Sequence, residues 1–355
     1  MPPKPSEAIV TTSLRRTVNT KFLDGLVATA RARADEPALI HKHRGVWVSR
    51  RWRDVLAEID RLAAGLRSLG LAPGDLVAVD GEITARLFLT AAAVLASGGR
   101  ILAVPISASA EELDRVLQDP AVALVLGQGR ETVAEWSAAT TKQRRVPIIF
   151  DHATPDSRPP DEGMVTLDNL RGLGAPLGWA EGLATTPPDG VEEILWTEET
   201  TDWREGLDVL LTDWISEGVP LALPELLAAA ARDRAEIGPG RWIASIDRIE
   251  RVAGTIRERL PERTSATGRL VAGALGGSRT PWAVGLSALL RKRIGLARLT
   301  GVEVYGPPGR DPSLEARQLF LQLGVPLSSR GRRDFGNRPA DAPQLGNLAA
   351  GGAVS

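Results

Sequence analysis

The chain has 355 residues, of which 43% are hydrophobic and 25% charged, enough to bury one large core or two coupled ones. Its formal net charge of −1 gives no basic field for nucleic acid or for an anionic membrane. The absence of cysteine excludes disulfides, thiolate metal sites and cysteine nucleophiles. Three histidines leave little room for histidine-based metal or triad chemistry, so we expect no metal site and no nucleic-acid partner.

No targeting or membrane-spanning segment is expected. Arg15 and Arg16 form a basic pair near the start, but no apolar stretch follows it, which argues against a signal peptide. The longest apolar stretch covers residues 87–106 and is interrupted by Gly98-Gly-Arg. It predicts an alanine-rich helix and then a strand, each too short to span a bilayer. The expected location is the cytoplasm.

In the first half of the chain, helical and strand patterns alternate. Residues 52–69 place apolar side chains at helical spacing, and Gly70 follows, which predicts a helix and its end. Four short apolar runs separated by helical stretches predict strands at residues 76–79, 101–105, 123–126 and 146–150. This alternation predicts an α/β fold with a mainly parallel sheet covered by helices.

Two proline-rich polar stretches predict a division of the chain into subdomains. Residues 151–161 and 185–190 are polar and rich in proline, and the second stretch is predicted to join two subdomains. Apolar spacing predicts helices at 221–234 and 246–260. From residue 332 onward there is almost no periodicity, which predicts a disordered tail. The predicted organisation is an N-terminal α/β subdomain over 1–188, a second α/β subdomain over 189–330 and a tail over 331–355.

Residues 196–206 carry the most informative motif, Trp-Thr-Glu-Glu-Thr-Thr-Asp-Trp-Arg-Glu-Gly. A loop that cradles a polyphosphate needs glycines that let backbone N–H groups approach, hydroxyls that bind the oxygens, and a lysine that neutralises charge. The loop resembles that of the AMP-forming, or adenylate-forming, acyl-CoA synthetases, which reads Tyr-Thr-Ser-Gly-Thr-Thr-Gly-x-Pro-Lys-Gly. The positions that keep this register are Trp196, Thr197, Thr200, Thr201 and Gly206.

Four of the five departures within the loop place a carboxylate where the family binds an anion. The family has Ser, Gly, Gly, Pro and Lys where this chain has Glu198, Glu199, Asp202, Arg204 and Glu205. Two like unit charges about 4 Å apart repel by about 4 kcal/mol at an effective dielectric of about 20. We therefore expect Thr197, Thr200, Thr201 and Gly206 to form a vestigial phosphate loop, with nucleotide binding weak or absent.

Shorter resemblances to the same family follow one another in the family's order. One reads Leu-Gly-Leu-Ala-Pro-Gly-Asp-Leu-Val at residues 69–77, like the family's strand entry. Others lie at residues 35–40, 45–48, 51–54, 99–105, 109–113, 123–126, 218–225, 236–239, 247–250, 293–299 and 319–327. The resemblance is strongest to long-chain fatty-acid CoA ligases. It implies the N-terminal domain of an adenylate-forming enzyme.

Further departures fall on the family's chemical motifs. The sequence is expected to lack several tens of residues between Gly206 and Gly218, including the helix after the loop. Residues 305–310 replace a motif that lines the nucleotide, and residues 330–334 replace one that stacks on adenine and helps to hold Mg²⁺. The chain ends about 20 residues later, so the C-terminal domain with its catalytic lysine is expected to be absent.

Three other candidate sites have simpler alternatives. A carboxylate cluster could bind a divalent cation, although strand and helix-start positions explain it equally well: Glu192, Glu193, Glu198, Glu199, Asp202 and Glu205. Arg330, Arg332 and Arg333 could receive a phosphate, although a solvated charge run is the commoner case. A third hypothesis is that three tryptophans fill the vacated nucleotide pocket: Trp196, Trp203 and Trp214.

The resemblance and the departures together predict a catalytically inactive pseudoenzyme with no catalytic residues and no metal, acting as a binding or regulatory partner in acyl metabolism. The expected partner is a full-length acyl-CoA synthetase paralogue or an acyl-handling complex. ATP or AMP and Mg²⁺ would bind only if residual affinity survives. Two alternatives stay open: residual long-chain acyl-CoA ligase activity completed by a partner, and a fatty-acyl or acyl-CoA sensor.

Overall fold

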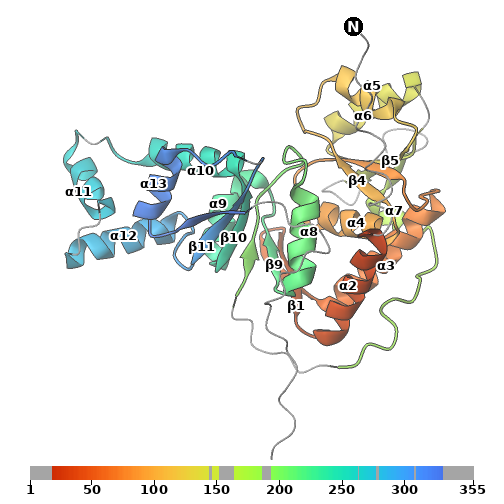
Figure 1. Ribbon diagram of the computed structural model, residues 1–355, viewed down its shortest axis with the longest axis horizontal. Helices are drawn as coiled ribbons and strands as arrows, with labels where there is room; N and C mark the ends of the chain where they lie inside the picture. Colours follow the sequence, from red (N-terminus) through yellow and green to blue (C-terminus); the bar gives the residue numbers. More distant parts are fainter. Residues whose placement is uncertain are drawn as a thin grey trace, which may run out of the picture.

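The computed structural model describes residues 18–143, 146–151, 164–185, 193–262, 264–276, 280–307 and 309–330. The predicted tail over 331–355 lies outside them, and so do Glu192, Arg332 and Arg333. The described chain is α/β, with two separate sheets and helices packed around them, as the sequence predicts (Figure 1).

The smaller sheet has five strands, and every neighbouring pair is parallel. Its strand order is β4 (Arg100–Ala103), β3 (Leu76–Asp80), β5 (Val122–Gln128), β6 (Ile148–Asp151) and β7 (Met164–Thr166). The four strands predicted in the first half of the chain are confirmed as β3 to β6. The side chains of β3, β5 and β6 are mostly buried, as expected of a parallel sheet covered on both faces, whereas those of the edge strand β4 are mostly half-buried.

Helices between these strands begin at recognisable caps. The predicted helix after residue 51 is α3 (Trp52–Ser68), which buries one apolar face and ends just before Gly70. Ser109 and Glu112 form a reciprocal capping box at the start of α5 (Ala110–Gln118). The other helices of this part are α2 (Val18–Ala32), α4 (Ala85–Ala96), α6 (Arg130–Gln143) and α7 (Leu167–Leu170).

The larger sheet has seven strands, and only its β1–β2 pair is antiparallel. Its order is β12 (Leu327–Arg330), β11 (Gly301–Tyr305), β10 (Arg241–Ser245), β8 (Leu195–Trp196), β9 (Leu221–Leu223), β1 (Pro37–His43) and β2 (Val46–Arg51). The N-terminal hairpin, which lies before the predicted boundary at residue 188, therefore joins a sheet whose other strands come from residues after it. As a statement about domains, that boundary stays a prediction.

The predicted helix at residues 221–234 is wrong in its first part. Residues 221–223 form strand β9, a 3₁₀ turn covers Leu227–Ala229, and α9 covers only Ala230–Ile237. Pro220 and Pro224 bracket the strand and prevent a continuous helix. The predicted helix at residues 246–260 is confirmed as α10 (Ile246–Arg259).

The second half also contains α8 (Gly206–Glu217), α11 (Ala266–Leu275), α12 (Pro281–Arg293) and α13 (Leu314–Gln322). Helix α8 follows residues 197–205 directly and leads straight into β9. The expectation that the helix after this loop is missing is therefore wrong, because α8 occupies that place.

The two sheets share one large hydrophobic core. Trp214 of α8 stacks on Trp52 of α3, with ring centroids 4.6 Å apart, and meets Phe88 of α4 edge-on at 5.2 Å. Its indole Nε1 donates a hydrogen bond to the carbonyl oxygen of Ala38 at 2.8 Å. Helix α8 thus contacts both the helices of the smaller sheet and a strand of the larger one, which couples the two halves.

Gly65 and Gly254 allow a matched test of how closely α3 packs against α7. A Cβ atom at Gly65 in α3 would lie 2.1 Å from the carbonyl oxygen of Leu170 in α7, whereas one at Gly254 in α10 would meet nothing within 4 Å. We expect Gly65→Ala to lower the free energy of unfolding by about 1–3 kcal/mol. Gly254→Ala should raise it by about 0.5–1 kcal/mol, because alanine favours the helix. Urea denaturation of both variants measures the difference, and an unchanged Gly65→Ala midpoint would contradict this packing.

Candidate functional site

The loop over residues 197–205 lies at the carboxyl end of β8, in the middle of the larger sheet. Strands β10 and β11, parallel to β8 within this sheet, end at Ser245 and Tyr305 on the same edge. In open parallel sheets, ligands bind outside the carboxyl ends of the strands, so the position is that of a ligand-binding loop. Residues 197–201 are nevertheless buried, each with less than 5% of its surface exposed.

The loop binds the other sheet through its backbone. The amide of Thr201 donates to the carbonyl oxygen of Gly81 at 3.0 Å, and the amide of Gly81 donates to the Thr201 hydroxyl at 3.1 Å. The amide of Ile83 donates to the carbonyl oxygen of Glu199 at 2.9 Å, and Glu82 and Thr200 form an antiparallel bridge. Residues 81–83 follow β3, so this loop contact joins the two sheets.

Glu198 is neutralised inside the protein. Arg234 of α9 donates from Nη1 to its carboxylate at 2.5 Å, and the indole of Trp196 donates to the same oxygen at 2.9 Å. The guanidinium also lies 4.4 Å from the ring centroid of Trp242 and donates from Nη2 to the carbonyl oxygen of Ile294. The carboxylate and the guanidinium are both almost fully buried, so each depends on the other for its charge balance.

Glu199 binds the first turn of α10. Its carboxylate accepts hydrogen bonds from the amide of Ser245 at 2.7 Å and from the Ser245 hydroxyl at 3.2 Å. Arg248 Nε lies 3.9 Å from the same carboxylate. A protein carboxylate thus occupies the anion-favouring end of this helix. Burial raises the pKa of Glu199 to about 7, against the opposing effects of Arg248 and Ser245.

The predicted site residues lie close together because they share one loop, but their polar groups are turned to the protein. Thr201 binds Gly81, and the Thr200 hydroxyl accepts from the amide of Asp202 at 3.3 Å. The Thr197 hydroxyl is buried, with no hydrogen-bond partner among the described residues. Gly206 begins α8, and a Cβ there would lie 2.7 Å from the Trp203 ring. Their role as phosphate ligands stays a prediction.

The loop's partners on α9 and α10 could not be found from the motif. Ser245 has the one local signal, a serine that ends a buried strand and caps the next helix by accepting from the amide of Arg248. Arg234 has none, because it lies in a run of polar residues, Arg-Asp-Arg-Ala-Glu, that reads as a solvated helix. Its neighbour Asp233 is also fully buried and pairs with Lys42 at 2.9 Å.

The other predicted carboxylates are spread over separate contacts. Asp202 accepts from the amide of Ile106 at 3.0 Å, and Glu193 lies 3.6 Å from Arg241. Glu205 is exposed. In the part of the chain that the structure describes, no three acidic or histidine side chains are grouped as metal ligands.

The three tryptophans proposed to fill one pocket lie in different places. Trp214 belongs to the core that couples the sheets, whereas Trp196 belongs to the core under α10 and α13. Trp203 is partly buried and lies 5.8 Å from the ring of Tyr305. Trp203 packs against the same core as Trp214, whereas Trp196 lies in the other core, so the three side chains do not fill one shared pocket.

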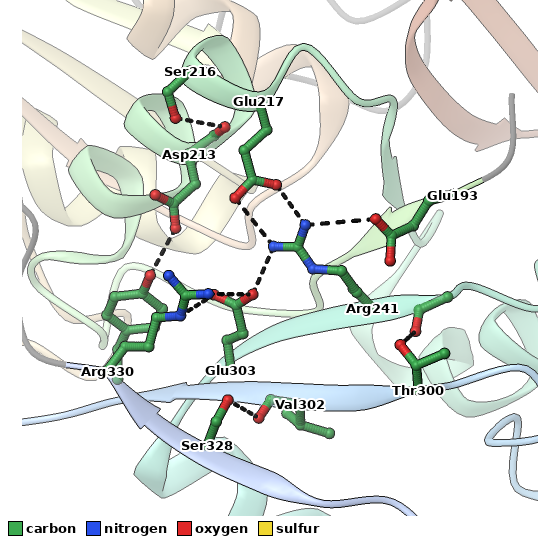
Figure 2. A network of polar contacts seen from close by, with 12 residues as sticks. Glu193, Asp213, Ser216, Glu217, Arg241, Thr300, Val302, Glu303, Ser328 and Arg330 are labelled. Carbon is green, nitrogen blue, oxygen red and sulfur yellow. Dashed lines mark hydrogen bonds and ion pairs between the residues drawn. The ribbon is translucent and has the colours of Figure 1, made fainter. Parts of the chain in front are cut away.

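A network of charges fixes α8 onto the larger sheet. Figure 2 shows Arg241 of β10 between Glu217, at the end of α8, and Glu303 of β11. Arg241 donates to Glu217 at 2.6 and 3.1 Å and to Glu303 at 2.6 Å. Arg330 Nε lies 2.8 Å from Glu303, so this arginine is part of an ion pair and not of a solvated charge run.

Tyr305, which begins one of the degenerate nucleotide motifs, also faces inward. Its hydroxyl donates to the Asp213 carboxylate of α8 at 2.7 Å. A Cβ at the next residue, Gly306, would lie 2.2 Å from a side-chain atom of Ile246. The end of β11 is therefore packed against α8 and α10.

The residues of this loop do not fit a nucleoside triphosphate with its Mg²⁺. The hydroxyl and amide of Thr201 are used by Gly81, and the helix end at Ser245 is occupied by Glu199. Glu205 stands at the position of the family's lysine. A phosphate at this loop would meet carboxylates and few available donors.

Comparison with known proteins agrees with this fold. Residues 26–178 match the family model described as AMP-binding enzyme. A search of curated proteins gave no match. One similar solved structure is acetoacetyl-CoA synthetase from Streptomyces lividans, with a TM-score of 0.58 and 16% identity over 87% of this chain and 51% of that chain.

Two further structures show the same likeness. A long-chain-fatty-acid-CoA ligase from Archaeoglobus fulgidus has a TM-score of 0.58 and 10% identity, over 88% of this chain and 63% of that one. The adenylation domain of a carboxylate reductase from Mycobacterium chelonae has a TM-score of 0.61 and 12% identity, and the likeness covers 89% of this chain and 59% of that one. The chain thus spans between about half and two-thirds of the length of these structures.

The fold is that of the N-terminal domain of adenylate-forming enzymes. The family match over residues 26–178 and the likeness in fold agree with the resemblance to the AMP-forming enzymes that the order of the motifs indicates. The loop over residues 197–205 departs from the family's motif at five positions, and residues 197–201 are buried by internal contacts.

Removal of the Glu198 carboxylate should strongly lower the stability of the folded protein. Glu198→Ala leaves Arg234 buried without its ion-pair partner, so we expect the free energy of unfolding to fall by about 3–5 kcal/mol. Glu205→Ala, an exposed position in the same loop, is the matched control and should change it by less than about 0.5 kcal/mol. Urea denaturation measures both, and equal effects would show that the buried pair does not hold the loop.

The raised pKa of Glu199 predicts a pH dependence. Because its pKa of about 7 in the folded state lies above the ordinary glutamate pKa of 4.5, folding favours the protonated form. The stability that Glu199 contributes is therefore present below about pH 4.5 and lost as the pH rises through about 7. Relative to Glu199→Gln, the native chain should lose about 3 kcal/mol over this window.

The measurement is urea unfolding of both proteins from pH 4.5 to 8. Burial also raises the pKa of Asp80 to about 7, but that residue is present in both proteins and its effect cancels. A difference that stays constant with pH would contradict the burial of Glu199.

Proposed function

We propose that the chain is a non-catalytic relative of AMP-forming acyl-CoA synthetases that acts by binding another protein in acyl metabolism. The observation that carries the proposal is that the loop's polar groups already bind other parts of the protein. Glu199 binds the start of α10, and Thr201 binds Gly81. The groups that would hold a polyphosphate are used to hold the protein together. The partner we propose is a full-length synthetase of the same superfamily or an acyl-handling complex.

The buried ion pair adds a second reason. Opening the loop to admit a nucleotide would separate Glu198 from Arg234, both almost fully buried, and leave two uncompensated charges. Separating such a pair costs about 3–5 kcal/mol, which a ligand would have to supply before any net binding. The cost of separating this ion pair therefore opposes nucleotide binding, in addition to the loss of the family's phosphate-binding residues.

The fold supports the choice of partner class. Solved structures with this fold include an acyl-CoA synthetase, a fatty-acid CoA ligase and an adenylation domain, at identities too low to carry over their substrates. The described residues contain no helix that could cross a membrane. We propose a cytoplasmic location for the protein and long-chain acyl groups as the cargo of its partner.

Titration calorimetry with ATP and Mg²⁺ tests the proposal. We expect no heat at millimolar nucleotide, and no acyl-AMP from purified chain, ATP and a long-chain fatty acid. The matched variant is Asp202→Gly with Glu205→Lys. It restores the family's residues at two exposed positions and leaves the buried ion pair between Glu198 and Arg234 intact. It should also fail to bind, because Glu199 and Thr201 are unchanged.

Two results would overturn the proposal. Micromolar binding of ATP by the native chain would mean that internal contacts do not close the loop. Formation of acyl-AMP, alone or after mixing with a full-length synthetase whose own catalytic lysine is replaced, would establish the residual-ligase alternative.

A further inference from the structure

The segment between Glu262 and Glu303 has a charge unlike the rest of the chain. It contains no acidic residue and seven basic ones: Arg263, Arg269, Arg279, Arg291, Lys292, Arg293 and Arg298. The chain as a whole has a formal net charge of −1. The overall charge, which predicts no attraction to an anionic membrane, therefore conceals one strongly cationic segment.

The described part of this segment forms two helices, α11 and α12, at one end of the molecule's long axis (Figure 1). Their exposed surface is apolar as well as cationic. Four large hydrophobic side chains are about half exposed: Leu270 at 54%, Trp282 at 49%, Val284 at 57% and Leu289 at 54%. Of the thirteen residues of α12, only Ala283 is fully buried. This hairpin is the densest group of exposed apolar side chains in the described chain.

The apolar and basic residues share one face of α12. Trp282, Gly285, Leu289 and Lys292 follow one another at spacings of three and four residues, and Arg293 adjoins Lys292. Gly273 of α11 lies beside Trp282, since a Cβ there would be 3.5 Å from Trp282 Cη2. Leu270 lies one helical turn before Gly273, so both helices contribute to this surface.

We propose that the α11–α12 hairpin, through Leu270, Trp282, Leu289, Lys292 and Arg293, docks on the surface of an anionic lipid bilayer. A helix with apolar residues and a tryptophan on an exposed face, followed by lysine and arginine, lies in the membrane interface. The absence of acidic residues over the segment matches the negative charge of lipid headgroups.

A second copy of the chain fits this surface less well. It would bring the same acid-free segment into contact, so cations would face cations across the interface. Membrane docking is independent of the proposed function, because the hairpin does not include the loop over residues 197–205. It would place an acyl-metabolising complex at the surface where acyl chains are found.

The test is co-flotation of the full chain with phosphatidylcholine vesicles, with and without about one third phosphatidylglycerol. We expect flotation with the anionic vesicles only, and loss of it as sodium chloride rises from 0.05 to 0.5 M. Lys292→Gln with Arg293→Gln should lower the partition coefficient roughly 30-fold, since each basic residue near the surface contributes about fivefold.

A second variant separates apolar docking from charge attraction. Trp282→Ser with Leu289→Ser removes two exposed apolar anchors and should lower partitioning at every salt concentration. Val46→Ser, at an exposed apolar position on the β1–β2 hairpin, is the matched control and should leave partitioning unchanged. Circular dichroism checks that each variant is folded.

Three outcomes would overturn the proposal. The first is no flotation with anionic vesicles, and the second is flotation that neither double variant reduces. The third is self-association, or capture of an acidic protein, that Trp282→Ser with Leu289→Ser abolishes while vesicles are not bound. Light scattering detects self-association in the same samples.

Discussion

The antiparallel contact between residues 199–201 and residues 81–83 is the constraint on which the rest of the structure depends. Each segment follows the carboxyl end of a strand, β8 in one sheet and β3 in the other. The two sheets meet here through hydrogen bonds that use the amide and hydroxyl of Thr201 and the carbonyl oxygen of Glu199, in a loop whose place in the fold suits ligand binding. Joining the sheets and binding a phosphate make competing demands on the same groups.

The carboxylates of the loop follow from that competition. A glycine at position 198 or 199 would leave Arg234 or the start of α10 without the anion each now has. Glutamates supply those charges from within, at the expense of an external anion. The loop therefore acts as a structural joint between the two sheets, with its own buried ion pair.

The sequence predicts the parts of this arrangement that depend on local pattern. The apolar spacing of α3 and α10 and the short apolar runs of β3 to β6 are visible in windows of a few residues. Strand β9 is missed because Leu-Ala-Leu reads equally as helix; Pro220 and Pro224 argue against a continuous helix, and pairing with β1 and β8 makes the segment a strand. Arg234 and Ser245 are missed as loop partners because a buried ion pair or cap contact between distant residues leaves no local signature.

The place of the N-terminal hairpin in the larger sheet has a consequence for biosynthesis. Leu39 of β1 pairs with Leu221 of β9, so the hairpin's sheet neighbour emerges 182 residues after it. At a synthesis rate of about 5–20 residues per second, the edge of β1 waits roughly 10–40 s for its partner. During that interval an apolar strand edge is open, and a chain that folds in this order has reason to engage chaperones before its second half is complete.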